Sequence, residues 1–284
     1  TITVALHRNA NRPIHTVAPP GTIVNCEFPA PLVGGNTELS PRITDVIFGA
    51  LAEAIPDRVP ASLGGTSCCF LFGGEHPDDG EFYSHFHFEG IGWGGRPRKD
   101  GNSQIIVING NCRNTPVEVF ESRYPIRVES YRLLEDSGGP GLNRGGLGIE
   151  RILTMETDSI TVSAIFNRMT VDPFGLHGGK PGMNSGIYVR FAGSAEWQTF
   201  TDAFGTDSPS KFANLTLRRG DQVKIVAPGG GGWGDPMQRP IERVKADLDE
   251  GFITPAAPES RYGVSASQAA DGTWSVAPAA GRGK

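Results

Sequence analysis

The stretch Pro228-Gly229-Gly230-Gly231-Gly232-Trp233-Gly234-Asp235-Pro236 carries four consecutive glycines between prolines and a tryptophan. Residues without a Cβ permit positive φ and let the backbone lie directly against another surface. The prolines and Trp233 restrict the segment, so we expect it to be held in place rather than loose. Two interpretations are open. Free N–H groups next to a helix predicted over residues 241–249 would suit an anion, whereas a tight connection between a last strand and that helix needs no ligand. The absence of a Walker Lys-Ser/Thr favours the tight connection.

The composition predicts a chain with many turns and a sizeable core. Its 284 residues include 39 glycines and 22 prolines, a high share that is still below low complexity. This length suits two lobes. The net charge is −5 and no Lys/Arg block occurs, so neither a nucleic acid nor an anionic membrane is expected as a partner.

The cysteines and the chain ends bear on location. Cys26, Cys68, Cys69 and Cys112 show no CxxC spacing and include an adjacent pair unsuited to a mutual disulfide, which favours a reducing cytoplasm. No long apolar run and no signal-peptide pattern is seen, so we expect neither a membrane span nor export. Position 1 is Thr, which indicates a processed chain or part of a longer one. An N-terminal Thr can also act as a nucleophile, so a self-processed hydrolase is an alternative.

Periodicity predicts the elements. Pro19-Pro20-Gly21 separates two short β-prone runs, which indicates a hairpin or a strand-turn-strand over residues 16–24. Apolar residues recur at three and four over residues 37–56 and predict one clear helix near 41–55, with Pro41 in its first turn. Alternation predicts a strand at residues 82–89. Further β-prone runs lie at residues 104–108, 126–134, 149–154, 159–166, 186–191, 215–217 and 222–226.

These elements predict an α+β, β-rich fold with antiparallel sandwich or barrel-like sheets and a few helices. We expect a mixed α/β lobe over residues 1–103 and a β-rich lobe over residues 104–236. Residues 237–284 should form a C-terminal helix and a loosely ordered tail.

His85, His87 and Glu89 alternate along one face of the predicted strand, opposite Phe86 and its neighbours. Residues at i, i+2 and i+4 place two imidazoles and a carboxylate in a row, which is a possible arrangement of metal ligands. His76 and the acidic residues around it could add a further ligand. The alternative is an ordinary solvated face opposite an apolar one, and this is favoured. His85 and His87 are therefore weak metal candidates.

Two polar groups beside glycine turns are the first candidates for chemistry. Glu89 precedes Gly90-Ile91-Gly92-Trp93-Gly94-Gly95-Arg96, where glycines would let a substrate or another chain approach the carboxylate. We predict that Glu89 acts as an acid/base or orienting carboxylate and that Arg96 pairs with a phosphate or carboxylate.

Residues 109–116 concentrate carboxamides, a thiol and a guanidinium. Asn111 and Asn114 could orient a planar amide or carboxylate through paired hydrogen bonds, although such residues are also ordinary turn formers. Glu118 follows and is a further candidate for substrate binding. Cys112 is either a nucleophile or a small hydrophobe.

Two more glycine-rich blocks occupy residues 138–148 and 175–182. The first is followed by a predicted strand, which argues against a dinucleotide-binding turn and favours close backbone packing. The second contains His177 and Lys180, which suit either anion contact or a plain surface loop.

The order and spacing of these blocks resemble the hydantoinase B/oxoprolinase family. The resemblance spans nearly the whole chain, but it covers only the C-terminal half of a typical member. It is carried by residues 114–121, Tyr124-Pro125, residues 137–141, 144–148, 175–182 and 228–236, and Tyr262-Gly263-Val264.

This resemblance implies a cytoplasmic assembly in which ATP with Mg²⁺ is held on a hydantoinase A-like subunit that phosphorylates a small-molecule substrate. The B-type subunit would then complete hydrolysis of a cyclic amide such as a hydantoin, 5-oxoproline or a lactam, because phosphate makes a good leaving group of an unreactive oxygen. The N-terminal half of the B-type subunit is expected as a separate chain or a removed segment. A divalent metal, Zn or Mn, would be bound by that half.

Two other functions remain open at this stage. Relatives in the family include ATP-dependent ketone carboxylases of the acetone and acetophenone type, which form the first alternative. A structural half-subunit without chemistry of its own is the second.

Overall fold

The computed structural model describes residues 17–279, so Thr1 and its predicted nucleophilic role lie outside the described residues. The chain divides into two compact units, residues 1–35 and 36–284. In the described part of the first unit an isolated bridge pairs Thr22 with Asn25. The hairpin expected there is thus a single turn, in keeping with two adjacent prolines that cannot donate to a strand ladder.

The helix predicted near residues 41–55 is present. A short π-helix, η1 (Gly35–Leu39), leads into α1 (Ser40–Leu51), and Pro41 occupies its first turn, where a missing N–H costs nothing.

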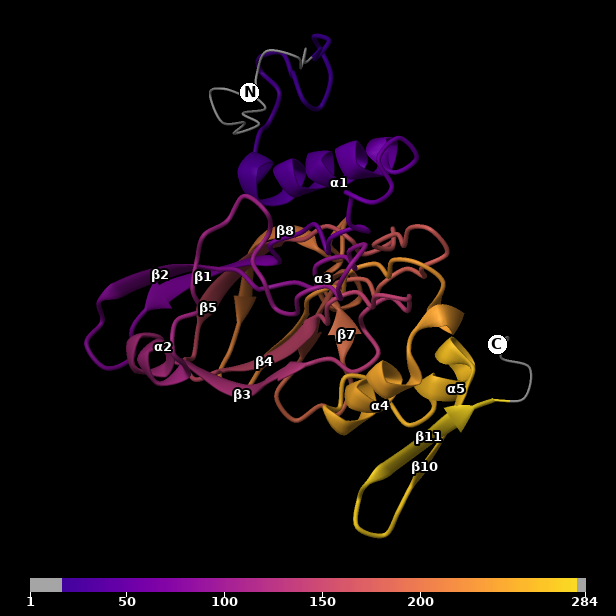
Figure 1. Cartoon of the computed structure of the whole chain (residues 1–284). Helices are drawn as coiled ribbons and strands as arrows, with labels where there is room; N and C mark the ends of the chain where they lie inside the picture. Colours follow the sequence, from indigo (N-terminus) through magenta and orange to yellow (C-terminus); the bar gives the residue numbers. More distant parts are fainter. Residues whose placement is uncertain (1–16, 280–284) are drawn as a thin grey trace. The chain divides into compact units, whose positions relative to one another are not determined.

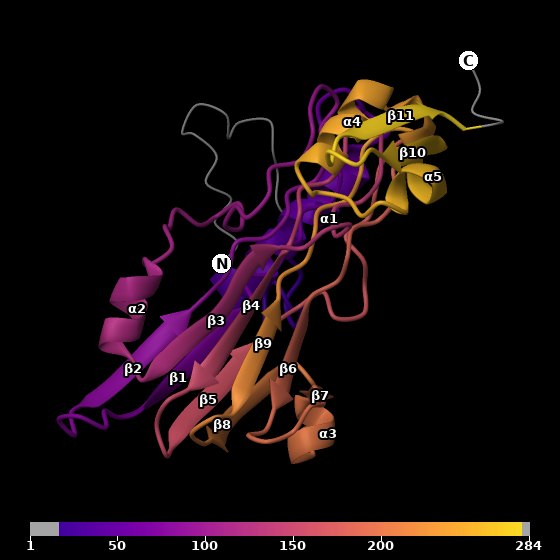
Figure 2. The same ribbon diagram turned by 90° about the horizontal axis from the view of Figure 1, so that it is seen from below.

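The second unit is built on two antiparallel sheets. One has the order β2 (Phe82–His87), β1 (Cys69–Glu75), β5 (Ile160–Ile165), β8 (Lys211–Leu217). The other has the order β3 (Ile126–Leu133), β4 (Ile149–Met155), β9 (Gln222–Val226), β6 (Gly186–Arg190), β7 (Gln198–Thr199). The sheets lie face to face (Figures 1 and 2), and a single apolar core contains residues from both, including Phe70, Val162, Leu153 and Ile225. The predicted α+β, β-rich fold with antiparallel sheets is confirmed.

Local details differ from the sequence prediction. Residues 104–108 form no strand, and Ile105 makes one isolated bridge to Ile91. β1 was not predicted, because its apolar run ends in the glycine pair Gly73-Gly74, which is typical of a turn. Two short helices, α2 (Val117–Arg123) and α3 (Phe200–Phe204), were also not predicted.

The C-terminal region contains more regular structure than its composition indicates. After η2 (Pro236–Gln238), α4 (Ile241–Asp249) and α5 (Ala257–Tyr262) are followed by a hairpin of β10 (Val264–Gln268) and β11 (Trp274–Pro278). These elements share a small apolar core centred on Leu248 and Tyr262. The buried guanidinium of Arg239 lies 2.8 Å from Asp100 and 2.7 Å from Asp247, and so ties η2 to α4 and to the loop before the second sheet.

The glycine run at residues 229–232 lies inside this fold, and its N–H groups are all used. Gly229 donates to Met183, Gly230 to Gly146, Gly231 to Ser62 and Gly232 to Lys180, over 2.9–3.1 Å. No N–H of the run is left to bind an anion. The interpretation of the run as an anion cradle is therefore wrong, and the tight structural connection is the correct one.

The run is the centre of a glycine layer, by which we mean residues 91–95, 138–148, 175–183 and 228–234 together. A Cβ added to Gly230 would lie 2.2 Å from the carbonyl oxygen of Trp93, and one added to Gly231 would lie 2.0 Å from that of Phe174. A Cβ on Gly145 would lie 1.9 Å from the oxygen of Gly230. Four segments distant in sequence thus pack backbone against backbone, and only glycine fits at these positions.

We predict that Gly230→Ala destabilises the protein by roughly 3 kcal/mol or more, because the obstacle is a backbone that cannot rotate away. Urea denaturation followed by circular dichroism measures the loss. Gly35→Ala is the matched control, since nothing lies within 4 Å of a Cβ added there. Equal stability of the Gly230→Ala variant and the wild type would contradict the description of the layer.

Candidate functional site

Two adjoining hollows lie along the loop at residues 104–114. The first, of about 270 Å³, is lined by Asn36, Thr37, Ser67, Phe86, Phe88, Ile106, Val107, Asn109, Gly110, Asn111 and Cys112. The second, of about 250 Å³, is lined by Phe88, Gly90, Gln104, Ile106, Cys112, Arg113 and Asn114. They share Phe88, Ile106 and Cys112, so together they form one elongated site that combines apolar walls with convergent polar groups. Such a site suits a small planar ligand.

The predicted amide readers both lie here. Asn114 donates its side-chain N–H to the hydroxyl of Tyr131, which leaves its carbonyl oxygen available as an acceptor. The carboxamide of Asn111 lines the first hollow and has no hydrogen-bond partner within residues 17–279. An acceptor and an unengaged amide can read the N–H and C=O of a cyclic amide.

Glu89 lies behind the second hollow and does not open into it. Its side chain is fully buried, and its carboxylate accepts hydrogen bonds from His87 Nε2 at 2.8 Å and from Arg151 Nε at 2.5 Å. Burial alone would raise the pKa of Glu89, but His87 and the Arg151 guanidinium outweigh it and hold this pKa below its usual value. Glu89 is therefore a carboxylate ion whose visible role is to hold its neighbours.

A chain of polar contacts joins Glu89 to the hollow. The guanidinium of Arg151, from β4, lies 3.7 Å from the ring centre of Tyr131, from β3. The Tyr131 hydroxyl in turn accepts hydrogen bonds from Gln104 and Asn114, which line the second hollow. The order Glu89, Arg151, Tyr131, Asn114 thus fixes the position of a side chain that faces the ligand space.

The two histidines of β2 face inward rather than outward. His85 packs against the rings of Phe72, Phe120 and Tyr124, with its ring centre 4.7 Å from that of Tyr124. Burial, and then the neighbouring His87, lowers the pKa of His85 to about 4. The sequence predicted that the histidine face of this strand is solvated, and this is wrong, because that face is packed against the protein. Phe82 and Phe86 on the opposite face are exposed instead.

Metal ligation by these histidines does not fit the geometry. Within residues 17–279 no three His, Cys, Asp or Glu side chains are grouped so that they could hold a metal ion. His87 is engaged by Glu89, and Nδ1 of His76 lies 3.8 Å from carboxylate oxygens of Asp78 and Asp79.

Arg96 and Glu118 lie apart from the two hollows. The guanidinium of Arg96 donates to the carbonyl of Asp100 and to Asn102, each at 2.7 Å, next to the glycine layer. Glu118 is exposed on the first turn of α2. The arginine that does line the site is Arg113.

Sequence reasoning missed Arg151, Tyr131 and Gln104. The first two come from strands that the sequence predicts as β-prone runs, but nothing local marks Arg151 as the partner of Glu89, 62 residues away. Gln104 has a positive φ of 54°, an unusual conformation for a residue other than glycine that can mark a functional position. This feature is visible in the structure but not in the sequence.

A larger hollow, of about 540 Å³, lies elsewhere, at the turn between β1 and β2. Its charged groups are His76, Glu75, Asp158 and Arg219, and the Arg219 to Asp158 pair at 2.9 Å is solvent-exposed on both sides. Exposed pairs of this kind contribute little, and none of the charged side chains that line this hollow is buried. Size alone does not make it the functional site.

Comparisons with known proteins agree with the fold and the glycine-rich blocks. The hydantoinase B/oxoprolinase family profile matches residues 4–236. The chain is 34% identical over 258 residues to a putative D-/L-hydantoinase B-type subunit of Pseudomonas sp. strain NS671, covering 89% of this chain and 40% of that protein. An uncharacterized protein of Methanocaldococcus jannaschii is 38% identical over 243 residues, covering 86% of this chain and 40% of that protein.

Two solved structures share the fold. The ATP-dependent caprolactamase from Pseudomonas jessenii superimposes with a TM-score of 0.76 at 27% identity, over 88% of this chain and 43% of that one. A nucleotide-free acetone carboxylase superimposes with a TM-score of 0.64 at 22% identity, over 81% of this chain and 33% of that one.

The chain belongs to the hydantoinase B/oxoprolinase family. It spans about two-fifths of the length of each of the two relatives compared above. None of the helices within residues 17–279 has the length and apolar character needed to cross a bilayer.

We predict that Glu89→Gln lowers the free energy of unfolding at pH 7 by roughly 3 kcal/mol, because it leaves Arg151 buried without its counter-charge. The lowered pKa of Glu89 means that its stabilisation is present above the unfolded pKa of about 4.3 and is lost as pH falls through the lower folded value. The gap between wild type and variant should therefore shrink below about pH 4.

Urea denaturation across this pH range measures that gap. The control is Glu118→Gln, which changes an exposed glutamate and should cost less than about 0.5 kcal/mol. A gap that is absent at pH 7, or that grows in acid, would contradict the assignment.

Proposed function

We propose that this chain is a component of an ATP-dependent cyclic-amide hydrolase, and that it binds the substrate after a hydantoinase A-like partner has phosphorylated it. The observation that carries this proposal is the elongated site, in which Asn111, Asn114 and Arg113 converge over apolar walls. Relatives described as the B-type component of a hydantoinase and the beta component of a caprolactamase support the choice of cyclic amides.

Each side chain has a distinct task in this proposal. The Asn114 carbonyl oxygen accepts from an N–H that the phosphorylated ring retains, as a hydantoin ring does, and the Asn111 amide donates to the ring nitrogen or to a carbonyl oxygen that remains. Arg113 binds the phosphoryl group by charge-assisted hydrogen bonds. Glu89, through Arg151 and Tyr131, is a positioning residue that orients Asn114.

The remaining groups come from outside the chain in this proposal. ATP and Mg²⁺ bind the A-type partner, which supplies the phosphoryl transfer. A divalent metal, Zn or Mn, is held by the remaining part of the B-type subunit. Phe88 and Ile106 line the ligand space with apolar groups and exclude bulk water from it before a water molecule attacks the activated ring carbon. The reducing cytoplasm is the proposed location, in keeping with buried free thiols at Cys68 and Cys69.

Reconstitution with the A-type partner and the rest of the B-type subunit tests the function. We expect ring opening of a hydantoin or 5-oxoproline that requires ATP and proceeds without bicarbonate. Strict dependence on bicarbonate with a ketone substrate would instead assign the chain to the carboxylases, whose fold it shares. Turnover that is unchanged without this chain would make it a structural component.

We predict that Arg113→Gln lowers kcat/KM in the reconstituted complex about 100-fold, because one charge-assisted contact to the phosphorylated substrate is lost. The thermal midpoint should stay unchanged, since Arg113 is exposed. Arg98→Gln is the control, as it removes another exposed guanidinium that does not line the site. Equal kcat/KM for the two variants would remove Arg113 from the proposal.

A further inference from the structure

Helix α1 presents its apolar side to the outside. Val46 is 70% exposed, Ile47 42% and Leu51 39%, and Ala50 between them is exposed as well. A surface helix normally buries its apolar stripe and shows its charges to water. In α1 the charged residues Arg42 and Asp45 lie on the packed side instead.

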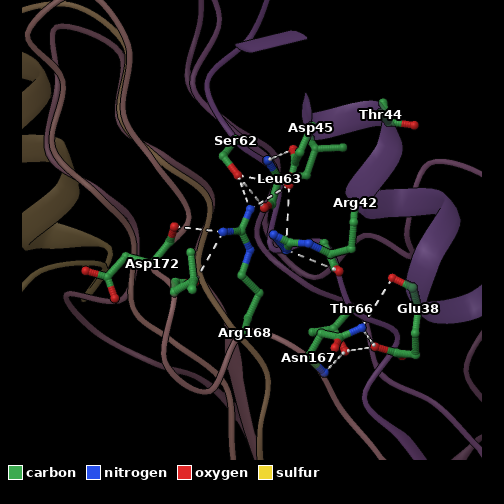
Figure 3. A network of polar contacts seen from close by, with 12 residues as sticks. Glu38, Arg42, Thr44, Asp45, Ser62, Leu63, Thr66, Asn167, Arg168 and Asp172 are labelled. Atoms are coloured by element: carbon green, nitrogen blue, oxygen red, sulfur yellow. Dashed lines mark hydrogen bonds and ion pairs between the residues drawn. The ribbon is translucent and has the colours of Figure 1, made fainter. Parts of the chain in front are cut away.

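The polar side of α1 is anchored firmly (Figure 3). Asp45 is buried and accepts from the Leu63 N–H at 2.9 Å and the Ser62 hydroxyl at 3.0 Å, and its carboxylate lies 2.6 Å from Nη2 of Arg168. Just before the helix begins, Glu38 accepts from the Thr66 hydroxyl at 2.6 Å and from the Ser67 N–H at 2.9 Å.

These contacts fix the rotation of the helix about its own axis. Turning α1 to bury Val46 would expose Asp45 and leave the buried Arg168 guanidinium without its counter-charge, which is strongly unfavourable. The outward apolar stripe is thus built into the fold.

The character of the stripe indicates a permanent contact. Between residues 40 and 51 its outward side carries no charged side chain, as expected of obligate interfaces and not of transient ones. β2 shows the same inversion, because Phe82 is 77% exposed while His87 is buried. Two elements therefore present apolar residues where a free-standing surface would present polar ones.

We propose that the outward stripe of α1, formed by Val46, Ile47, Ala50 and Leu51, is the docking surface for the remainder of the B-type subunit. The length of the relatives is the reason for choosing this binding partner. This chain accounts for 40% of the B-type hydantoinase relative and 42% of the beta component of the caprolactamase, and the rest of such a polypeptide is a permanent neighbour. The identity of that occupant rests on the proposed function.

The test measures binding of the full chain to a tagged probe. The probe is the portion of the Pseudomonas sp. NS671 relative outside its match to this chain, produced separately. The triple variant Val46→Gln/Ile47→Gln/Leu51→Gln should bind at least tenfold more weakly than wild type by biolayer interferometry. Its thermal midpoint should stay within a few degrees, because these side chains are already exposed and glutamine is a good helix former.

The matched control is Val119→Gln, which changes a 38% exposed valine on a different helix, α2, and should bind as wild type does. Equal binding of the triple variant and wild type, or no binding of wild type to the probe, overturns the proposal. Light scattering of the chain alone adds a third outcome. A dimer that the triple variant converts to monomer would overturn it too, because a second copy would then occupy the stripe.

The surface and the function can fail separately. If probe binding depends on α1 but the reconstituted complex opens no ring with ATP, the proposed function is wrong and the docking surface still holds. ATP-dependent ring opening with unchanged probe binding by the triple variant would sink the docking surface alone.

Discussion

Close contact between backbones in the glycine layer is the constraint on which the rest of the structure depends. The carbonyl oxygens of Trp93, Phe174 and Gly230 occupy the space where side chains would stand, and the N–H groups of residues 229–232 all donate to other segments. This layer fixes where the chain enters β4 and where it leaves β9. It also sets the start of the loop that carries Gln104 and Asn114.

Much of the fold could be predicted from the sequence, because alternation and periodicity are local. α4 begins and ends where its apolar spacing indicates, and β4, β6 and β9 lie within a residue or two of their predicted bounds. β1 was not predicted because Phe70 and Phe72 are followed by Gly73-Gly74, a pair typical of turns. Residues 104–108 have strand composition, but they pair only at Ile105, since the glycine layer takes up the neighbouring backbone.

The candidate site was predictable only in part, because a periodic pattern does not say which face is packed. The sequence placed His85, His87 and Glu89 on one side of a strand, but it could not show that α2 covers that side with Phe120. Nor could it show that Arg151 completes the Glu89 cluster from another sheet. Asn111 and Asn114 were predicted because their amides are clustered in sequence, whereas Arg113 became a candidate only because it lines the hollow in the structure.

The position of the glycine run along the chain has a consequence for biosynthesis. Its partners at residues 91–95, 138–148 and 175–183 are all made before it, and each lacks some of its backbone partners until residues 228–234 arrive. The layer therefore cannot close on the ribosome until translation has passed the last of these glycines. The glycine layer therefore forms late in the synthesis of this unit. Until then, part of the amides in the earlier segments are hydrogen-bonded to water.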